Sequence, residues 1–159
     1  MLAEAIPTTD RVPTAEEFRR TLAAVRRFVL AQSDRLAGSE NLSHRHLDDY
    51  LVFHATRGTL AVVWAAGAVV GVAIAWQTNT RTVLAAAREN RDVFDWTPSE
   101  PQGDCVYLAL VLTTAPGAIR QLANYFLASC PNWRELKQFA QRRGRLVNAR
   151  RTLQKLAGE

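Results

Sequence analysis

Residues 113–120, "TTAPGAIR", combine small side chains, a proline and a glycine at the predicted start of a helix. The first N–H groups of a helix have no partner within the helix, and they point at whatever occupies its N-terminus. Pro116 suits the first helical turn, because its missing N–H would be unpaired there in any case. The pattern predicts an anion-binding turn made of Thr113, Thr114, Ala115, Gly117, Ala118 and Arg120. The alternative is an ordinary connection whose proline and glycine only set the turn.

His44 is the candidate general base. It lies at the predicted start of another helix, where the helix dipole disfavours a protonated imidazole and leaves the neutral ring free to accept a proton. The alternative is that His44, His46 and His54 are polar residues of the surface or of a helix face. Tyr125 and Cys130 are further reactive side chains, and we expect both to pack rather than to react.

The two cysteines, Cys105 and Cys130, lie far apart in the sequence and form no CxxC motif. A disulfide framework or a zinc site is therefore not expected, and no metal is predicted. The first thirty residues lack the uninterrupted apolar block of a secretory signal. These features favour reduced thiols and a cytoplasmic protein.

The most apolar stretch is "LAVVWAAGAVVGVAIAW", residues 60–76, which carries no charge. As a helix it would rise about 26 Å, slightly less than the roughly 30 Å of a bilayer core, and Gly67 and Gly71 would form a GxxxG motif. As strands, residues 59–65 and 68–77 are rich in valine, and Gly67 between them can supply a positive φ in a tight hairpin. We favour the buried hairpin, so no membrane span is expected.

The N-terminal half of the chain predicts helices. Thr14 and Glu17 form a capping box, and apolar residues then recur at helical spacing as far as Leu36. A second helix starts after Ser43, with an apolar face that includes Leu47, Tyr50, Leu51 and His54, and ends before Gly58. A third is predicted over residues 80–92, followed by a loop over 97–103.

The C-terminal half begins with "CVYLALVLT", residues 105–113, an uncharged run typical of a strand that is buried on both faces. Residues 117–129 carry apolar side chains at helical spacing and end at Pro131. A weak alternation from Trp133, with a turn around Gly144, predicts a final pair of strands.

Basic residues are concentrated near the C-terminus of a chain whose formal net charge is +5. We expect an acidic protein or a nucleic acid to contact Arg142, Arg143, Arg145, Arg150 and Arg151. The alternative is a solvated basic edge. A homodimer is a further expectation.

The length of 159 residues fits one domain. Residues 1–13 are predicted to be a disordered lead-in and residues 14–159 a single domain.

The predicted order is helix, helix, hairpin, helix, strand, helix, strand. Together with four short stretches it resembles the GNAT superfamily of N-acetyltransferases, and within it the RTX-toxin-activating lysine acyltransferases. The stretches are "LSHRH" (42–46), "VVGVAIAW" (69–76), "DWT" (95–97) and "TTAPGAIRQLANYF" (113–126). The resemblance covers about residues 42–147. It implies an α/β (α+β) fold: a mixed sheet with a central β-hairpin, flanked by helices and preceded by a long N-terminal helix.

The resemblance also implies a function. In the resembled acyltransferases a histidine in the context of His44 works with an aspartate on the buried strand, whereas residues 105–113 contain no carboxylate and Asp104 precedes them. The turn at residues 113–120 has one glycine where acetyl-CoA users have two. The implied donor is acyl-CoA or the phosphopantetheine of acyl-carrier protein, bound at that turn.

The sequence therefore predicts an acyltransferase-like protein that transfers an acyl group to an amine. The alternatives are a non-catalytic GNAT-like binding module, of a phage or mobile element, and a basic nucleic-acid-binding protein.

Overall fold

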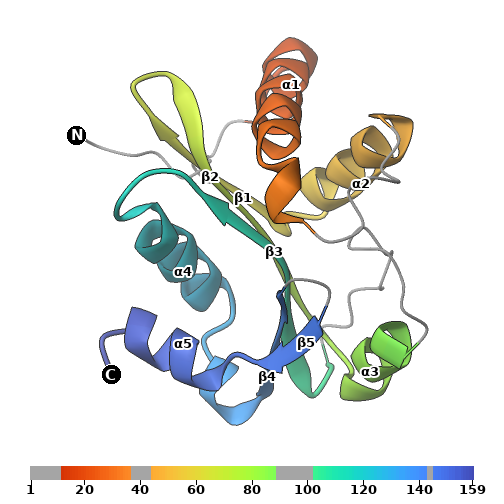
Figure 1. Cartoon of the computed structure of the whole chain (residues 1–159), viewed down its shortest axis with the longest axis vertical. Coiled ribbons are helices and arrows are strands. Elements are labelled where there is room, and N and C mark those ends of the chain that lie inside the picture. Colours follow the sequence, from red (N-terminus) through yellow and green to blue (C-terminus); the bar gives the residue numbers. More distant parts are fainter. Residues whose placement is uncertain (1–11, 37–43, 89–101, 143–144) are drawn as a thin grey trace.

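The computed structural model describes residues 12–36, 44–88, 102–142 and 145–159. Within them a five-stranded sheet has the order β1-β2-β3-β4-β5, and helices cover both of its faces (Figure 1). The strands are β1 (Leu60–Ala65), β2 (Ala68–Thr78), β3 (Cys105–Thr113), β4 (Lys137–Arg142) and β5 (Arg145–Asn148). All neighbours are antiparallel except β3 and β4, which are parallel. The predicted α+β class with a mixed sheet around a hairpin is confirmed.

The apolar run of residues 60–76 is the predicted hairpin. β1 and β2 pair antiparallel across a two-residue turn in which both Ala66 (φ 50°) and Gly67 (φ 75°) have positive φ. Positive φ at both positions gives the type I′ geometry that matches the twist of the flanking strands. No helix in the described part of the chain is long and apolar enough to cross a bilayer.

The run has no charged residue because both of its faces are covered. Leu60 and Val62 point toward helices α1 and α2, whereas Ala61 and Val63 point toward helix α4. Alternate side chains therefore face opposite sides of the sheet, but the sequence shows no alternation of apolar and polar residues, because both faces require apolar side chains.

Two helices cover one face of the sheet. They are α1 (Ala15–Ala31), which ends in the 3₁₀ turn η1 (Ser33–Arg35), and α2 (His44–Thr56). The capping box of Thr14 and Glu17 is present. The first helix was predicted to reach Leu36 but ends at Ala31, where the chain tightens into η1.

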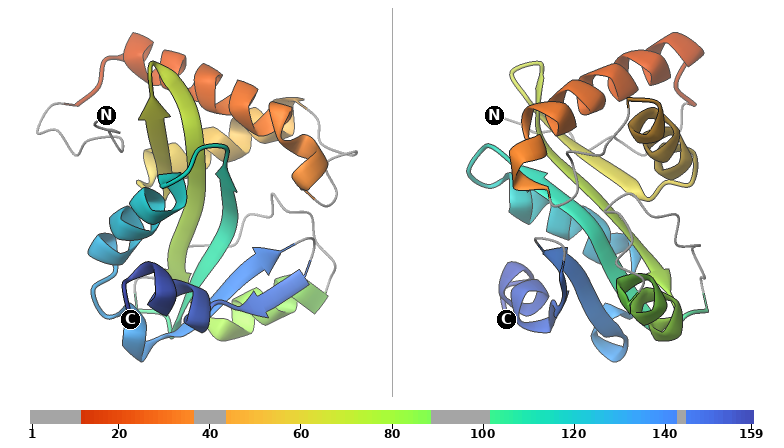
Figure 2. Two further views of the ribbon diagram at one scale, coloured as in Figure 1. Left: turned by 60° about the vertical axis from the view of Figure 1, so that its left-hand side comes forward. Right: turned by 45° about the vertical axis from the view of Figure 1, so that its right-hand side comes forward.

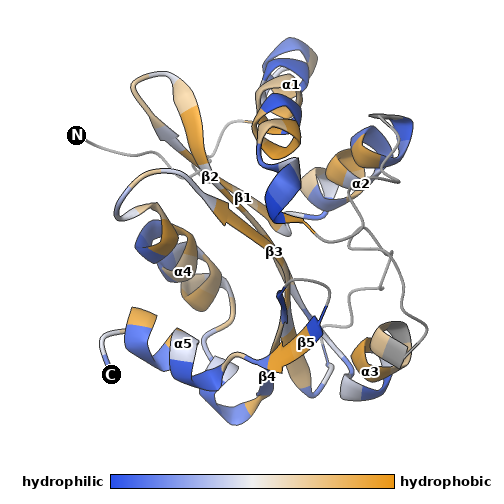
Figure 3. Ribbon diagram, viewed as in Figure 1, coloured by the Kyte–Doolittle hydropathy of each residue, from blue (hydrophilic) through white to orange (hydrophobic). Residues whose placement is uncertain are grey.

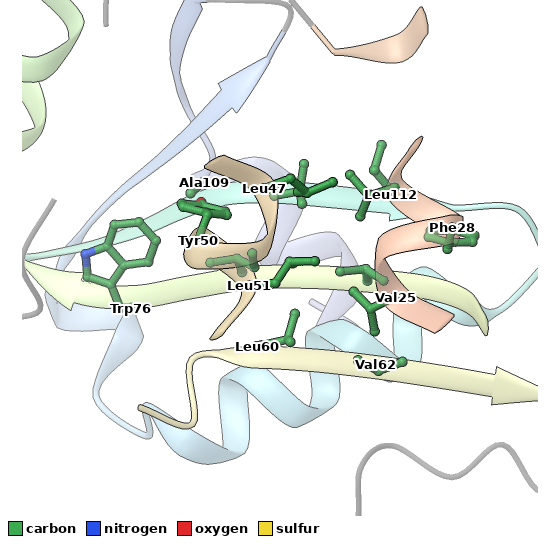
Figure 4. Packing of buried hydrophobic residues seen from close by; sticks show 14 residues of the cluster. Val25, Phe28, Leu47, Tyr50, Leu51, Leu60, Val62, Trp76, Ala109 and Leu112 are labelled. Atoms are coloured by element: carbon green, nitrogen blue, oxygen red, sulfur yellow. The ribbon is translucent and has the colours of Figure 1, made fainter. Parts of the chain in front are cut away.

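The core beneath these two helices is the largest cluster of buried side chains (Figure 4). Every residue of the predicted apolar face of α2 is buried, including Leu47 and His54. An ion pair of 2.8 Å between Arg26 and Asp48 joins the two helices at the surface.

The opposite face carries α4 (Ala118–Ser129) and α5 (Arg150–Leu156), with the 3₁₀ turn η3 (Trp133–Glu135) between α4 and β4 (Figure 2). Trp133 was expected in a strand, but it lies in η3 and is buried against Phe126 and Leu153. The predicted strand pair is present as β4 and β5. The helix α5 was not predicted, and α3 (Thr80–Arg88) matches the described part of the third predicted helix.

Candidate functional site

The predicted anion-binding turn connects β3 to α4. The N–H of Ala118 donates to the carbonyl of Ala115 at 3.3 Å, and Gly117 has φ 82° and ψ −16°. A left-handed third residue preceded by proline defines a type II β-turn, in which Gly is favoured because other residues are strained there. Pro116 was expected in the first helical turn, but the helix begins at Ala118. Proline therefore sets the bend before the helix.

The turn presents backbone donors to solvent. Among the described residues no acceptor faces the N–H groups of Ala115, Gly117, Ile119 and Arg120. Gly117 precedes the first helical residue and has no side chain to cap these groups. Unpaired N–H groups at a helix start attract an anion, and the helix dipole adds to this attraction.

Two arginines stand beside these donors. Arg120 is exposed in the first turn of α4. Arg35, from η1, donates from Nη1 to the carbonyl of Thr113 at 2.9 Å and to Oε1 of Gln32 at 3.3 Å. A residue 78 positions away in the sequence thus lies against the start of the turn. No sequence pattern pointed to Arg35, because nothing in its local context links it to β3.

A bulge fixes the start of the turn relative to the hairpin. In the β1–β2 pairing Val63 faces Gly71 while Trp64 faces Val69, so Val70 is an extra residue. The carbonyl of Val70 accepts from the N–H of Thr114 at 2.9 Å, which extends the β2–β3 ladder by one pair beyond Gly71 and Thr113. The turn is therefore anchored to the bulge by a backbone hydrogen bond.

The strands diverge below the turn. β3 and β4 pair only from Cys105 to Leu108, opposite Lys137 to Ala140, and the rest of β3 has β2 as its strand partner. A second bulge lies at the point of divergence, because Ile74 pairs with Leu110 and Ala75 with Leu108, which leaves Ala109 extra. Figure 2 shows β3 and β4 separating from this level upward.

The bulge changes which way β3 points its side chains. Tyr107 and Ala109 face α1 and α2, and strict alternation would turn Leu110 to the opposite face. Instead Leu110 and Leu112 also pack beneath α1 and α2. Val111 is consequently on the other face and 36% exposed.

A cavity of about 260 Å³ lies between the hairpin and the turn. Its lining is mostly apolar and consists of Val63, Trp64, Ala65, Val70, Ala115, Pro116, Ala118 and Gln121. Two of the predicted donor-site residues, Ala115 and Ala118, therefore line it. Ala118 is buried because Gly71 of β2 leaves room for the helix: a Cβ on Gly71 would lie 3.3 Å from the Cβ of Ala118.

The predicted general base is only partly described. His44 is the first residue of α2, and its side chain lies outside the described part of the structure. Its role as a base stays a prediction.

Asp104, the nearest carboxylate to β3 in the sequence, is hydrogen-bonded to the start of α3. Its two oxygens accept from the N–H and the hydroxyl of Thr80 at 2.7 and 3.0 Å, and Lys137 lies 3.7 Å away. The hydrogen bond from the Thr80 N–H lowers the pKa of Asp104 below its ordinary value, and the Thr80 hydroxyl and the charge of Lys137 lower it further. Asp104 therefore caps the start of α3.

The other reactive side chains pack. Cys105 and Cys130 are free and buried, and burial raises both pKa values, that of Cys105 to about 11. Tyr125 is half-buried against the core beneath α4. These thiols are protonated at neutral pH, which argues against a thiolate nucleophile.

His54 was expected either on the apolar face of the second helix or as a polar residue of the surface or of a helix face, and the structure places it on the buried face of α2. It is 2% exposed, stacks on Trp76 and meets Tyr50 edge-on. Desolvation, and then the charge of Arg57, lowers its pKa from 6.5 to about 4. The ring is neutral at physiological pH.

No cluster of metal-binding side chains occurs in the described ranges. The residues around the turn instead offer N–H groups and guanidinium groups, which bind anions.

Comparison with known proteins gives a distant likeness of fold. No family model matches the chain, and no curated protein matches it. Among solved structures, the chain is similar to the crystal structure of an N-acetyltransferase from Staphylococcus aureus Mu50. The identity is 16% and the TM-score 0.43, over 93% of this chain and 86% of that one. We therefore base the function on the geometry of the turn and of the diverging strands.

Proposed function

We propose that this protein binds an acyl donor through a phosphate group at the β3–α4 turn and transfers the acyl group to an amine. The observation that carries the proposal is the set of unpaired N–H groups of Ala115, Gly117, Ile119 and Arg120, flanked by Arg35. Acyl-CoA and the phosphopantetheine of acyl-carrier protein both bring a phosphate joined to a long thiol arm.

The diverging strands give that arm a path. The pairing between β3 and β4 ends at Leu108, and Ala109 bulges at the same level. A pantetheine that starts at the turn and runs down β3 would meet strand backbone without a β4 partner. Its amides can pair with such backbone groups as a further strand would.

The reaction follows from the two substrates. The amine nitrogen attacks the thioester carbonyl, a C–N bond forms, the C–S bond breaks and the thiolate takes up a proton. A base must remove one proton from the attacking nitrogen, and His44 is our candidate for it. Backbone N–H groups near the thioester would stabilise the oxyanion that forms on the carbonyl.

A non-catalytic binding module is the second candidate. It is favoured by the composition of β3, since Cys105–Thr113 contains no carboxylate, and by Asp104, which is engaged with Thr80 and Lys137. A histidine without a carboxylate partner is less firmly oriented as a base. Such a module would bind the donor at the same turn without turnover.

The first experiment tests the turn by thermal unfolding with and without coenzyme A. Bound ligand at a hundred times its Kd stabilises a protein by about 2.7 kcal/mol. We expect coenzyme A to raise Tm and pantetheine, which lacks the nucleotide phosphates, to raise it far less.

Two variants at one position supply the matched control. Gly117 has φ 82°, and no atom lies within 4 Å of a Cβ built there, so Asn and Asp both fit and both tolerate positive φ. Gly117→Asp places a charge beside the phosphate, and repulsion of roughly 2–3 kcal/mol should weaken binding about a hundredfold. Gly117→Asn should bind much as the parent does. Equal Tm shifts for the two variants would count against this site.

Turnover separates the two candidates. Purified protein is incubated with acetyl-CoA or an acyl-carrier protein thioester and a lysine-containing peptide, and free thiol is measured. Release that depends on the peptide and falls in His44→Gln supports the transferase. Binding without release supports the module.

A further inference from the structure

Five exposed cations are carried by the consecutive elements β4, β5 and α5: Arg142, Arg145, Arg150, Arg151 and Lys155. We call them the basic face. None forms an ion pair with a residue in the parts of the chain that the structure describes. The neighbouring cations differ, because Arg134 pairs with Glu159 and Lys137 with Asp104. Arg143 lies outside the described residues. Figure 3 shows blue and white over most of α5, whereas the adjoining strands carry both blue and orange segments.

The hairpin of β4 and β5 places two like charges opposite each other. Arg142 and Arg145 are register partners in the antiparallel pair. Side chains of such partners lie on the same face with their Cβ atoms roughly 5 Å apart, and like charges there destabilise the sheet. The face is the one on which α5 packs, since Ala140, two residues before Arg142, contacts the cluster that contains Leu153.

Helix α5 also carries cations in unfavourable positions. Arg150 and Arg151 occupy its first turn, which contains no acidic residue, although the positive end of the helix dipole favours acids there. Arg151 and Lys155 are four residues apart and therefore neighbours on the helix surface, where like charges repel.

Helix α1 of the same chain has the opposite, stabilising arrangement. Glu16 and Glu17 lie in its first turn, and Arg20 pairs with Glu16 four residues before it. The first turn of α5 thus has the reverse of this charge pattern. A polyanion would relieve the repulsion among the cations of the basic face.

We propose that the basic face binds the phosphate backbone of double-stranded nucleic acid without reading its sequence. Four of the five cations are arginines, whose planar guanidinium groups bind phosphate in a bidentate manner. No aromatic residue occurs from Arg142 to Glu159, so the surface lacks both the stacking rings of single-strand binders and the aromatic anchors of protein interfaces. Val147 is the large hydrophobic residue exposed there, at 36%.

The test is fluorescence anisotropy with a labelled 20-base-pair DNA duplex of arbitrary sequence, titrated at several salt concentrations. Five phosphate contacts predict a log–log salt slope of about −4.5, or a loss of roughly 500-fold in affinity between 50 and 200 mM salt. A second duplex of different sequence should bind equally. The Gly117→Asp protein should bind DNA as the parent does, because this proposal is independent of acyl transfer.

Arg142→Gln/Arg145→Gln removes two contacts and should reduce the slope by about two. The matched control is Arg19→Gln/Arg20→Gln on α1, which lowers the formal charge by the same amount, from +5 to +3. An equal loss of binding in both variants would mean that net charge alone attracts DNA and would overturn the proposal. So would displacement by poly-glutamate as effective as that by duplex, which would identify an acidic polypeptide as the partner.

Thermal unfolding of the free protein provides a second readout. Arg145→Gln should raise Tm at low salt, because it removes the repulsion with Arg142. A lowered Tm would show that the two charges do not oppose folding, and the electrostatic basis of the proposal would fail.

Discussion

The buried imidazole of His54 makes stability depend on pH in a defined window. Its Nδ1 lies 2.8 Å from the hydroxyl of Thr59, and that hydroxyl donates to the carbonyl of His54 at 3.2 Å. Nδ1 is therefore the nitrogen that carries the proton. Nε2 is buried with no hydrogen-bond partner among the described residues. Protonation would place a charge and a new donor at Nε2, where nothing accepts it.

The sign and size follow from the two pKa values. Between pH 6.5 and pH 4 the unfolded chain binds a proton at His54 that the folded chain does not, so the free energy of unfolding falls as pH falls. Each pKa unit is worth about 1.36 kcal/mol, which gives about 2 kcal/mol lost at pH 5 and about 3 kcal/mol in all. Above pH 6.5 the contribution is fully present.

The assay is urea unfolding followed by tryptophan fluorescence at pH 7.5, 6.5, 5.5 and 4.5. The control is His54→Phe, which keeps a ring between Trp76 and Tyr50 but does not titrate. Carboxylates titrate alike in both proteins, so the difference between the two pH profiles isolates His54. Parallel profiles between pH 6.5 and 4.5 would refute the reasoning.

Two further predictions concern the turn. Gly71→Val should destabilise the protein by about 1–3 kcal/mol, because its side chain would press on Ala118 and Leu122, each 3.3 Å from a Cβ at that position. The control is Ala68→Val, at an exposed position of the same strand, which should change the free energy of unfolding little. Equal urea midpoints for the two variants would contradict the close packing of α4. Arg35→Gln should weaken binding of coenzyme A about tenfold, because it removes the cation beside Thr113. Arg27→Gln on α1 is the control and should leave the affinity unchanged. Calorimetry measures both affinities, and an unchanged affinity in Arg35→Gln would show that Arg35 does not contribute to the binding site.

Strong local signals predicted most of the elements. The hairpin was predictable because Gly67 interrupts a valine-rich run, and α1 because Thr14 and Glu17 cap it. β3 matches its prediction from Cys105 to Thr113. Helix α5 was missed because its seven residues owe their burial to one side chain, Leu153, which packs against residues from α4 and η3.

The site was predictable in part. Pro116 and Gly117 identified the turn, although not its type II geometry. Neither bulge could be predicted from the sequence, because Val70 and Ala109 lie within apolar runs in which an extra residue does not change the hydropathy pattern. Arg35 reaches the turn through the packing of α1 and η1 on the sheet, a contact that depends on tertiary structure alone.

The extra residue at Ala109 divides β3 between two environments. Before it, odd-numbered positions face α1 and α2; after it, even-numbered positions do. If the bulge were straightened with all nine residues kept, Leu110 and Leu112 would turn to the far side of the sheet, which would expose the first core and overfill the second. The bulge therefore decides which positions of β3 must be apolar for each core: odd-numbered positions before Ala109 and even-numbered positions after it serve the core beneath α1 and α2.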